Sequence, residues 1–175
     1  MMTIKTILTE PNQILRQVSK PVGKVGEEER KLMDDMLDTM YHANGIGLAA
    51  IQIGVPKRII VMDLSKREEE KKPMYFVNPV IKNKNQNFSR YEEGCLSVPN
   101  QFAEIERPKT CEVEYLDYDG EKKIIKAEGL LATCIQHEMD HLQGILFIDY
   151  LSKLKKSMII KKLSKDKNKS DRITF

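Results

Sequence analysis

The segment from His137 to His141 limits what this chain can fold into more than any other. It places two histidines four residues apart, with Glu138 between them, at the end of an apolar run. A helix turns about 100° per residue, so His137 and His141 stand one turn apart on the same face, within reach of one metal ion. Unpaired imidazoles and a carboxylate would be costly inside an apolar helix, and a metal ion removes that cost. With Gly144 as a stop signal, the pattern predicts a buried helix that carries a metal pair and a general base.

A catalytic metal site takes a third protein ligand and leaves one position open to water. The chain after the motif supplies no convincing third ligand, because Phe147 stands where one class of zinc protease has a histidine, and no glutamate follows Glu138. Cys95, which follows a glycine in an expected turn between strands, is the best-placed candidate. Cys134 is the alternative, since it lies three residues before His137 on the same helix face. Three ligands along one helix, however, would close a tetrahedron poorly.

The composition is that of an ordinary globular domain. The chain has 175 residues, 41% of them hydrophobic and 31% charged, which is enough for one domain with its own core. The three cysteines are too few, and odd in number, for a disulfide framework, which favours a reducing compartment. The N-terminus shows no apolar signal segment, and no stretch is long enough to span a bilayer. We therefore expect a cytoplasmic protein that does not enter a membrane.

The net charge of +3 is distributed unevenly along the chain. Residues 153–175 contain nine basic residues and two aspartates, a net charge of +7, which leaves −4 for the rest. A basic segment on a mildly acidic body suits a polyanionic partner such as nucleic acid or the ribosome, but a solvated tail has the same composition. This basic segment is the only feature of the sequence that supports nucleic-acid binding.

Periodicity in the remaining chain indicates a mixture of helices and strands. Apolar residues recur with a period of 3.6 from 27 to 42, which predicts a helix there. Strands are expected at 58–62, 74–81, 110–118 and 122–127. Pro79 interrupts the second of these strands, and Asp119-Gly120 predicts that the last two form a hairpin. These elements indicate a single α+β domain.

The glycine-rich stretch from Gly45 to Gly54 matches the start of a dinucleotide-binding fingerprint, but its neighbours are in the wrong order. That fingerprint needs a strand before it and a helix after it, whereas here the expected helix precedes and the expected strand follows, so nucleotide binding is rejected. The stretch can instead pair with an extended peptide as an added strand. Its one amide side chain, Gln52, is either a turn residue or a donor aimed at developing negative charge, and the sequence does not decide between them.

Together, these stretches resemble the signature of the peptide deformylases. The signature has three blocks in a fixed order, and each is complete here: GxGLAAxQ at residues 45–52, EGCLS at 93–97 and QHExDHLxG at 136–144. The resemblance covers about residues 3–160. It implies antiparallel β-sheets around a central metal-binding HExxH helix, with an N-terminal and a C-terminal helix. It also implies an enzyme that removes the N-formyl group from the N-terminal methionine of newly synthesised proteins and releases formate.

The resemblance further implies roles for individual residues. The implied metal ligands are Cys95, His137 and His141. They would bind one divalent ion. Fe²⁺ is the preferred ion, and Zn²⁺, Ni²⁺ or Co²⁺ are alternatives. Metal-bound hydroxide would attack the formyl carbonyl, with Glu138 as general acid and base and with Gln52 and the Leu96 N–H as the oxyanion hole.

The substrate implied by the resemblance is the N-formylmethionyl end of a nascent peptide. The methionine side chain would enter an apolar pocket formed by Ile46, Leu130 and Cys134. The peptide backbone would pair with Gly45, Ile46 and Gly47. Phe102 stands where some members of the family have an arginine, which leaves the contact with downstream substrate residues open.

The ends and the surroundings of the motif complete the expectations. We expect a catalytic domain at residues 1–165 and a basic, flexible tail at 166–175, and the resemblance implies that the basic C-terminal helix docks on the ribosome. Glu93 and Asp140 are expected to orient ligands, with a simple salt bridge from Asp140 to Arg107 as the alternative. Two other functions stay open: a zinc protease, which the missing downstream ligand disfavours, and a non-catalytic metal- or peptide-binding module, which the intact Glu138 and Gln52 disfavour.

Overall fold

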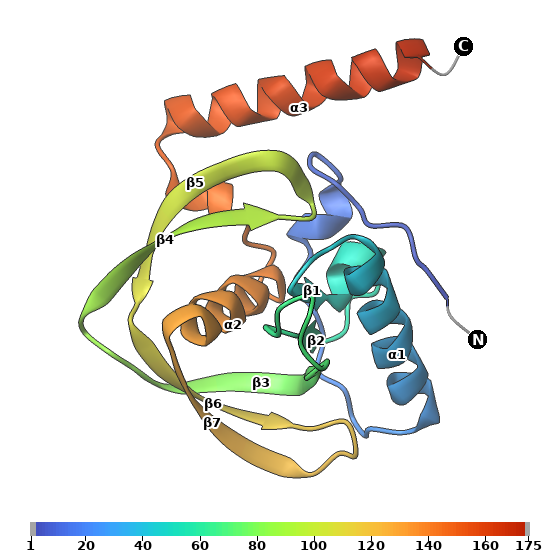
Figure 1. Cartoon of the computed structure of the whole chain (residues 1–175), viewed down its shortest axis with the longest axis vertical. Coiled ribbons are helices and arrows are strands. Elements are labelled where there is room, and N and C mark those ends of the chain that lie inside the picture. The colour runs from blue at the N-terminus through green and yellow to red at the C-terminus, as the bar shows by residue number, and fades with distance from the viewer. Residues whose placement is uncertain (1–2, 174–175) are drawn as a thin grey trace.

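The computed structural model describes the backbone of residues 3–173 and the side chains of residues 3–165. Its elements, with η for short 3₁₀ helices, are η1 (Gln13–Arg16), α1 (Glu27–His42), β1 (Gly47–Ala49), η2 (Ala50–Ile53), β2 (Ile59–Met62), β3 (Met74–Lys84), β4 (Phe88–Cys95), β5 (Val98–Pro108), β6 (Thr110–Leu116), β7 (Lys122–Glu128), α2 (Gly129–His141), η3 (Phe147–Tyr150) and α3 (Lys153–Ile173). Within these residues, one sheet has the order β1-β2-β3-β6-β7, and β4 and β5 form a separate ribbon (Figure 1). Neighbouring strands in both are antiparallel, which confirms the predicted α+β class with antiparallel sheets.

Strand β2 is apolar on both faces because a helix packs against each face. Side chains alternate along a strand. Ile60 and Met62 belong to the core on the α2 side, whereas Ile59 and Val61 belong to the core on the α1 side. All four are fully buried. Figure 1 shows β1 and β2 between the two helices, so this strand pair forms the middle of the domain.

Helix α1 forms where the period of 3.6 predicts it. Its first turn is Glu27–Glu29, and these negative charges suit the positive end of the helix dipole. Glu29 also accepts a hydrogen bond from the Gly26 N–H at 3.0 Å, which satisfies one of the unpaired donors at the helix start. The methionine stripe of its inner face, Met33, Met36 and Met40, is fully buried, as expected for core residues.

Helix α2 carries the histidine motif and lies between the five-stranded sheet and the β4–β5 ribbon (Figure 1). It ends at His141, and Gly144 follows in the left-handed region with φ of 74°, as the sequence predicted for a stop signal. A Cβ at this position would lie 2.3 Å from the Arg16 carbonyl oxygen. The helix is buried from Ala132 to Glu138, as its apolar sequence predicted.

The structure contains the predicted β6–β7 hairpin, and it shows how Pro79 affects β3. The β6–β7 hairpin forms at Asp119-Gly120, and Gly120 has φ of 84° there. Pro79 does not end its strand: β3 continues to Lys84, and the disturbance appears instead as a register shift against β6 between Val77 and Val80. The interruption predicted at Pro79 is therefore a local irregularity within a longer strand.

A third core joins the ribbon to helix α3. It contains Val98, Ile105, Leu146, Phe147, Ile148 and Ile159. Beyond this contact α3 extends along one side of the molecule (Figure 1). Its backbone is helical through Ile173, while residues 174–175 lie outside the described part, so the division into a domain and a flexible tail at residue 165 stays a prediction. Within the described residues, no helix has both the length and the apolar character needed to cross a membrane.

Candidate metal centre

Three side chains that are distant in the sequence meet at one point of the fold. Cys95 comes from the end of β4, and His137 and His141 come from α2. Their candidate ligand atoms all lie within 4.8 Å of one another, and Cys95 Sγ is 3.4 Å from His141 Nε2. One sulfur and two imidazole nitrogens form a three-ligand set of the kind that divalent metals use in catalytic sites. The donor chemistry of these residues therefore fits a metal ion.

Cys134, the other cysteine considered as a third ligand, does not belong to this group. It is buried on the inner face of α2, where burial raises the pKa of its thiol well above the ordinary value. A neutral thiol of this kind behaves as a small apolar side chain. Cys111 is buried in the core between the sheet and α2, as its position in a strand suggested.

A cleft of about 520 Å³ opens onto Cys95 and His137, two of the three candidate ligands, and onto Glu138. Its lining includes every residue predicted to bind substrate: Gly45, Ile46, Gly47, Leu130 and Cys134. Ile46 and Leu130 are 44% and 47% exposed, so their apolar surface is available to a ligand. Tyr91 and Thr133 also line the cleft, although sequence reasoning did not include them. Thr133 lies four residues before His137, so helical spacing could have predicted that it shares the face of the motif. The position of Tyr91 could not be predicted in this way, because it depends on how β4 folds toward α2.

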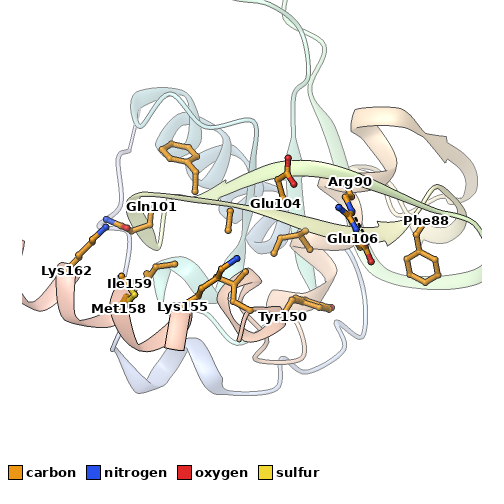
Figure 2. A pocket seen from close by; sticks show the side chains of 14 residues that line it. Phe88, Arg90, Gln101, Glu104, Glu106, Tyr150, Lys155, Met158, Ile159 and Lys162 are labelled. Atoms are coloured by element: carbon orange, nitrogen blue, oxygen red, sulfur yellow. Dashed lines mark hydrogen bonds and ion pairs between the residues drawn. The ribbon is translucent and has the colours of Figure 1, made fainter. Parts of the chain in front are cut away.

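A larger groove of about 900 Å³ lies between the β4–β5 ribbon and the first turns of α3 (Figure 2). Lys155, Met158 and Lys162 form its α3 side. None of the candidate metal ligands lines this groove. It shares Gln101 and Phe102 with the cleft, and Phe102 is 64% exposed. The smaller cleft, which Cys95, His137 and Glu138 line, is therefore the candidate site.

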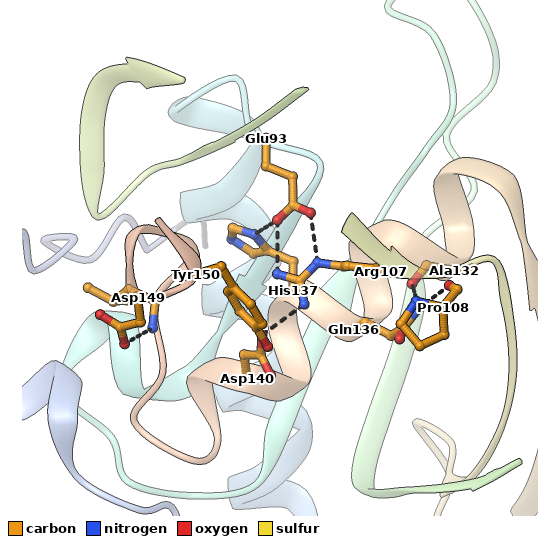
Figure 3. Close-up of polar contacts among 10 residues, drawn as sticks. Glu93, Arg107, Pro108, Ala132, Gln136, His137, Asp140, Asp149 and Tyr150 are labelled. Carbon is orange, nitrogen blue, oxygen red and sulfur yellow. Dashed lines mark hydrogen bonds and ion pairs between the residues drawn. The ribbon is translucent and has the colours of Figure 1, made fainter. Parts of the chain in front are cut away.

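Glu93 fixes the orientation of His137. Its Oε1 lies 2.8 Å from His137 Nδ1, which leaves Nε2 as the nitrogen for a metal (Figure 3). Glu93 in turn accepts hydrogen bonds from Arg107 Nε and Nη2 at 2.7 Å and 3.0 Å. These hydrogen bonds outweigh the effect of burial and lower the pKa of Glu93, so the carboxylate stays ionised.

Asp140 belongs to the same group of contacts. Arg107 Nη1 donates to Asp140 Oδ2 at 2.8 Å, which confirms the ion pair that the sequence suggested. The Tyr150 hydroxyl donates to the same oxygen at 2.8 Å, and the Arg107 guanidinium lies 5.0 Å from the Tyr150 ring centre. Through Arg107 and Glu93 this ion pair reaches His137 (Figure 3), so the two interpretations of Asp140, pairing and ligand orientation, describe one set of contacts.

Glu138 is buried beside Gly47. A Cβ at Gly47 would lie 2.7 Å from Glu138 Oε1, so the absence of a side chain makes room for the carboxyl. Burial raises the pKa of Glu138 to about 7. Among the described residues Glu138 Oε2 and His141 Nδ1 have no hydrogen-bond partner, although both are buried. An unpartnered Glu138 Oε2 beside a thiol and two imidazoles is expected where an ion or a polar ligand belongs. His141 Nδ1 points away from Cys95, because Nε2 is the ring nitrogen beside that sulfur.

Gln52 faces the ligand group from the opposite side. Its Oε1 accepts a hydrogen bond from the Ala49 N–H at 2.9 Å, and its Nε2 donates to Ser97 Oγ at 3.0 Å. The same Nε2 lies 3.7 Å from Cys95 Sγ. Gln52 therefore lies in a turn, η2, and its amide nitrogen points toward Cys95, while its role as a donor to developing negative charge stays a prediction. Ser97 is a contact that sequence reasoning missed.

Comparison with known proteins gives consistent matches over nearly the whole chain. The family model described as Polypeptide deformylase matches residues 4–157. A peptide deformylase of Pelagibacter ubique is 78% identical over 167 residues, which cover 95% of this chain and 97% of that protein. The peptide deformylase of Maricaulis maris is 58% identical over 171 residues, 98% of each chain. The crystal structure of peptide deformylase from Ehrlichia chaffeensis has a TM-score of 0.92 and 43% identity, covering 96% of this chain and 99% of the other.

Proposed function

Because this chain belongs to the peptide deformylase family, it is a metal-dependent hydrolase that removes the N-formyl group from nascent peptides, and we propose that the cleft beside α2 is where it does so. The observation that carries this assignment is the meeting of Cys95, His137 and His141, with the buried Glu138 at their side. A thiol and two imidazoles can bind a metal ion, and a carboxyl beside them can transfer protons. Hydrolysis of a formyl amide uses both functions.

We propose that Cys95 Sγ and one imidazole nitrogen each from His137 and His141 hold a single divalent ion. Fe²⁺ is the expected ion in the cell, with Zn²⁺, Ni²⁺ or Co²⁺ able to take its place, since mixed sulfur and nitrogen ligands suit these metals. Burial lowers the pKa of His141 well below its ordinary value, which favours the neutral imidazole that a metal requires. When bound, the metal would polarise the formyl carbonyl and lower the pKa of a water molecule.

Glu138 is proposed as the general base and acid. Its carboxyl titrates near neutrality, so it can accept a proton from the attacking water and later return that proton to the leaving amine. The bond that breaks joins the formyl carbon to the amino nitrogen of methionine, and the products are formate and a free N-terminus. Gly47 keeps the neighbouring backbone close without filling the space that the carboxyl occupies.

Gln52 and the Leu96 N–H are proposed to form the oxyanion hole. Negative charge builds on the formyl oxygen during attack, and donors fixed in advance stabilise it without reorganisation. The Gln52 amide is fixed at its oxygen by Ala49 and presents its nitrogen beside Cys95. One such donor contributes about 3 kcal/mol to transition-state stabilisation.

Substrate binding is proposed to follow the walls of the cleft. Ile46, Leu130 and Cys134 offer an apolar pocket for the methionine side chain, while the backbone of Gly45 to Gly47 pairs with the peptide. If Leu130→Trp leaves the preference for methionine over small residues unchanged, the pocket lies elsewhere.

We propose two further features of the cellular setting. Nascent peptides are made in the cytoplasm, where the reduced Cys95 that the site needs is stable. The exposed lysines at the start of α3 suit the negative surface of the ribosome. Cosedimentation with ribosomes should weaken when the chain is truncated after Leu151, and unchanged cosedimentation would argue against docking through α3.

The decisive experiment is formate release from formyl-Met-Ala-Ser by protein loaded with Ni²⁺ or with Fe²⁺ under anaerobic conditions. We expect release by the wild type, loss in Glu138→Ala with the metal retained, and loss of the metal itself in Cys95→Ala. Ser19→Ala is a control, because it removes a buried hydroxyl that has no hydrogen-bond partner among the described residues and lies outside the cleft. Metal retained in Cys95→Ala, or full activity in Glu138→Ala, would overturn the corresponding role.

A further inference from the structure

The hydroxyl of Ser97 contacts the side-chain amide of Gln52. Ser97 lies in the turn between β4 and β5, is 0% exposed, and accepts a hydrogen bond from Gln52 Nε2 at 3.0 Å. We propose that Ser97 is a positioning residue for deformylation: its hydroxyl holds the Gln52 amide so that the second N–H of Nε2 points at the developing oxyanion. This inference rests on the oxyanion role proposed for Gln52.

The number of hydrogen-bond donors and acceptors on the Gln52 side-chain amide fixes its orientation. The Gln52 nitrogen carries two hydrogens and its oxygen carries none. The oxygen accepts from the Ala49 N–H and one hydrogen is donated to Ser97, so the second hydrogen points to the cleft side, where Nε2 donates to Cys95 Sγ over 3.7 Å and where an oxyanion would take the place of the sulfur as the acceptor. Rotation of the amide by half a turn would set its NH₂ against the Ala49 N–H, donor against donor. Ser97 therefore completes a two-point attachment that leaves one N–H for the reaction.

The backbones of both residues are held independently of this hydroxyl. Leu8 donates its N–H to the Gln52 carbonyl at 2.7 Å, and Glu10 donates its N–H to the Ser97 carbonyl at 2.8 Å. Loss of the hydroxyl should therefore leave η2 and the β4–β5 turn where they are. Only the freedom of the Gln52 amide should change, and that change should appear in the chemical step rather than in substrate binding.

A double-mutant cycle tests this proposal with metal-loaded protein and formyl-Met-Ala-Ser. Gln52→Ala should lower kcat about 10²-fold, the usual effect of losing one oxyanion donor. Ser97→Ala should lower kcat about tenfold with KM within about twofold, because the amide keeps its attachment to Ala49. The double variant should be no slower than Gln52→Ala, since Ser97 acts only through that side chain.

Metal content and thermal unfolding are measured for each variant, with Ser19→Ala as the control for a deleted buried hydroxyl. Additive losses in the double variant, an unchanged kcat in Ser97→Ala, or a Ser97→Ala protein that unfolds or loses metal would each overturn the positioning role. An unchanged kcat in Gln52→Ala would instead remove the oxyanion role of Gln52 itself. A slow Gln52→Ala with a normal Ser97→Ala would leave that role intact and reject only the inference about Ser97.

Discussion

Arg107 and Glu93 form a buried ion pair with two contacts, at 2.7 Å and 3.0 Å, and neither side chain is more than 5% exposed. Glu93 lies on β4 opposite Ala103, and Arg107 lies on β5 opposite Ser89, so the pair joins the two strands diagonally beside His137. A buried pair of this kind stabilises little relative to apolar residues, but each partner depends on the other. The hydrogen bonds from His137 and Arg107 lower the pKa of Glu93 against the effect of burial, so loss of Arg107 removes part of what keeps this carboxylate ionised.

The first prediction follows from this dependence. Arg107→Met should lower the free energy of unfolding by about 3–5 kcal/mol, because it leaves Glu93 buried without its partner. Urea unfolding of the metal-free protein measures the loss without a contribution from the ion. Arg90→Met is the matched control, since Arg90 and Glu106 pair across the same ribbon at 2.6 Å but on its exposed face, and it should be indistinguishable from the wild type. Equal losses in the two variants would contradict the argument from burial.

The effect of metal removal on thermal stability should distinguish Cys95, a proposed ligand, from Cys134, which is not one. An ion that binds only the folded protein, at one hundred times its Kd, stabilises by about 2.7 kcal/mol, or roughly 5–10 °C in Tm for a chain of this size. We expect this difference between metal-loaded and chelated protein in the wild type and in Cys134→Ala, and its disappearance in Cys95→Ala. Differential scanning calorimetry measures it, and a Cys134→Ala protein that no longer responds to metal would reverse the assignment.

Gly47→Ala should impair the reaction while the fold survives. The added methyl group would lie 2.7 Å from Glu138 Oε1 and 3.1 Å from Cys134 Sγ, so the carboxyl must move. We expect kcat to fall about 10²-fold, the range for a misplaced general base, with metal content unchanged. Gly23→Ala is the control, because a Cβ there meets nothing within 4 Å. Wild-type kcat in Gly47→Ala would show that the carboxyl tolerates displacement.

Gly144→Ala should cost stability rather than chemistry. The residue has φ of 74°, and its Cβ would lie 2.3 Å from the Arg16 carbonyl oxygen, a backbone atom that cannot turn away. Strain in the left-handed region and the displaced backbone together should lower the free energy of unfolding by about 3 kcal/mol. Chemical denaturation measures this loss, and a change below about 0.5 kcal/mol would mean that the η1 segment moves freely.

Acid stability should depend on Asp149. Burial raises the pKa of this carboxyl, but hydrogen bonds from Arg16, Lys156 and the Leu146 N–H outweigh burial and lower it. Because the folded pKa lies below the unfolded value of about 4, these contacts stabilise the protein above that pH and are lost as the pH falls through the folded pKa. Asp149→Asn should therefore be less stable than the wild type at pH 7, with the difference shrinking toward pH 3. A constant difference across urea titrations from pH 7 to pH 3 would contradict this account.

The part of the site on α2 was predictable because its information is local. The spacing of His137 and His141, the apolar run before them and Gly144 after them are all properties of one helix, and each was found where expected. The choice between Cys95 and Cys134 could not be made from spacing, because it depends on how β4 and β5 fold back toward α2. The sequence favoured Cys95 through its expected turn and through the poor geometry of three ligands on one helix, and the three sequence blocks implied the same residue.

The turn at Cys95 was expected, but the bounds and register of the ribbon's two strands escaped prediction for a physical reason. Strands are recognised by alternation of apolar and polar residues, but the exposed β4 carries mostly polar and charged side chains. Its register, with Glu93 opposite Ala103, sets which charges become buried. The ion pair of Glu93 with Arg107 and the contact of Gln52 with Ser97 are products of that register, so neither was visible before the fold was known.

The hydrogen bonds from Leu8 to Gln52 and from Glu10 to Ser97 have a consequence for synthesis. Together with the bond from the Ser19 N–H to the Leu142 carbonyl, they tie residues 8–19 to partners that lie much later in the sequence. Contacts over such sequence distances form slowly. A ribosome that has translated the chain through Ser97 has made Gln52 and Cys95 but not His137 or His141, so the candidate metal ligands can meet only after α2 has been made.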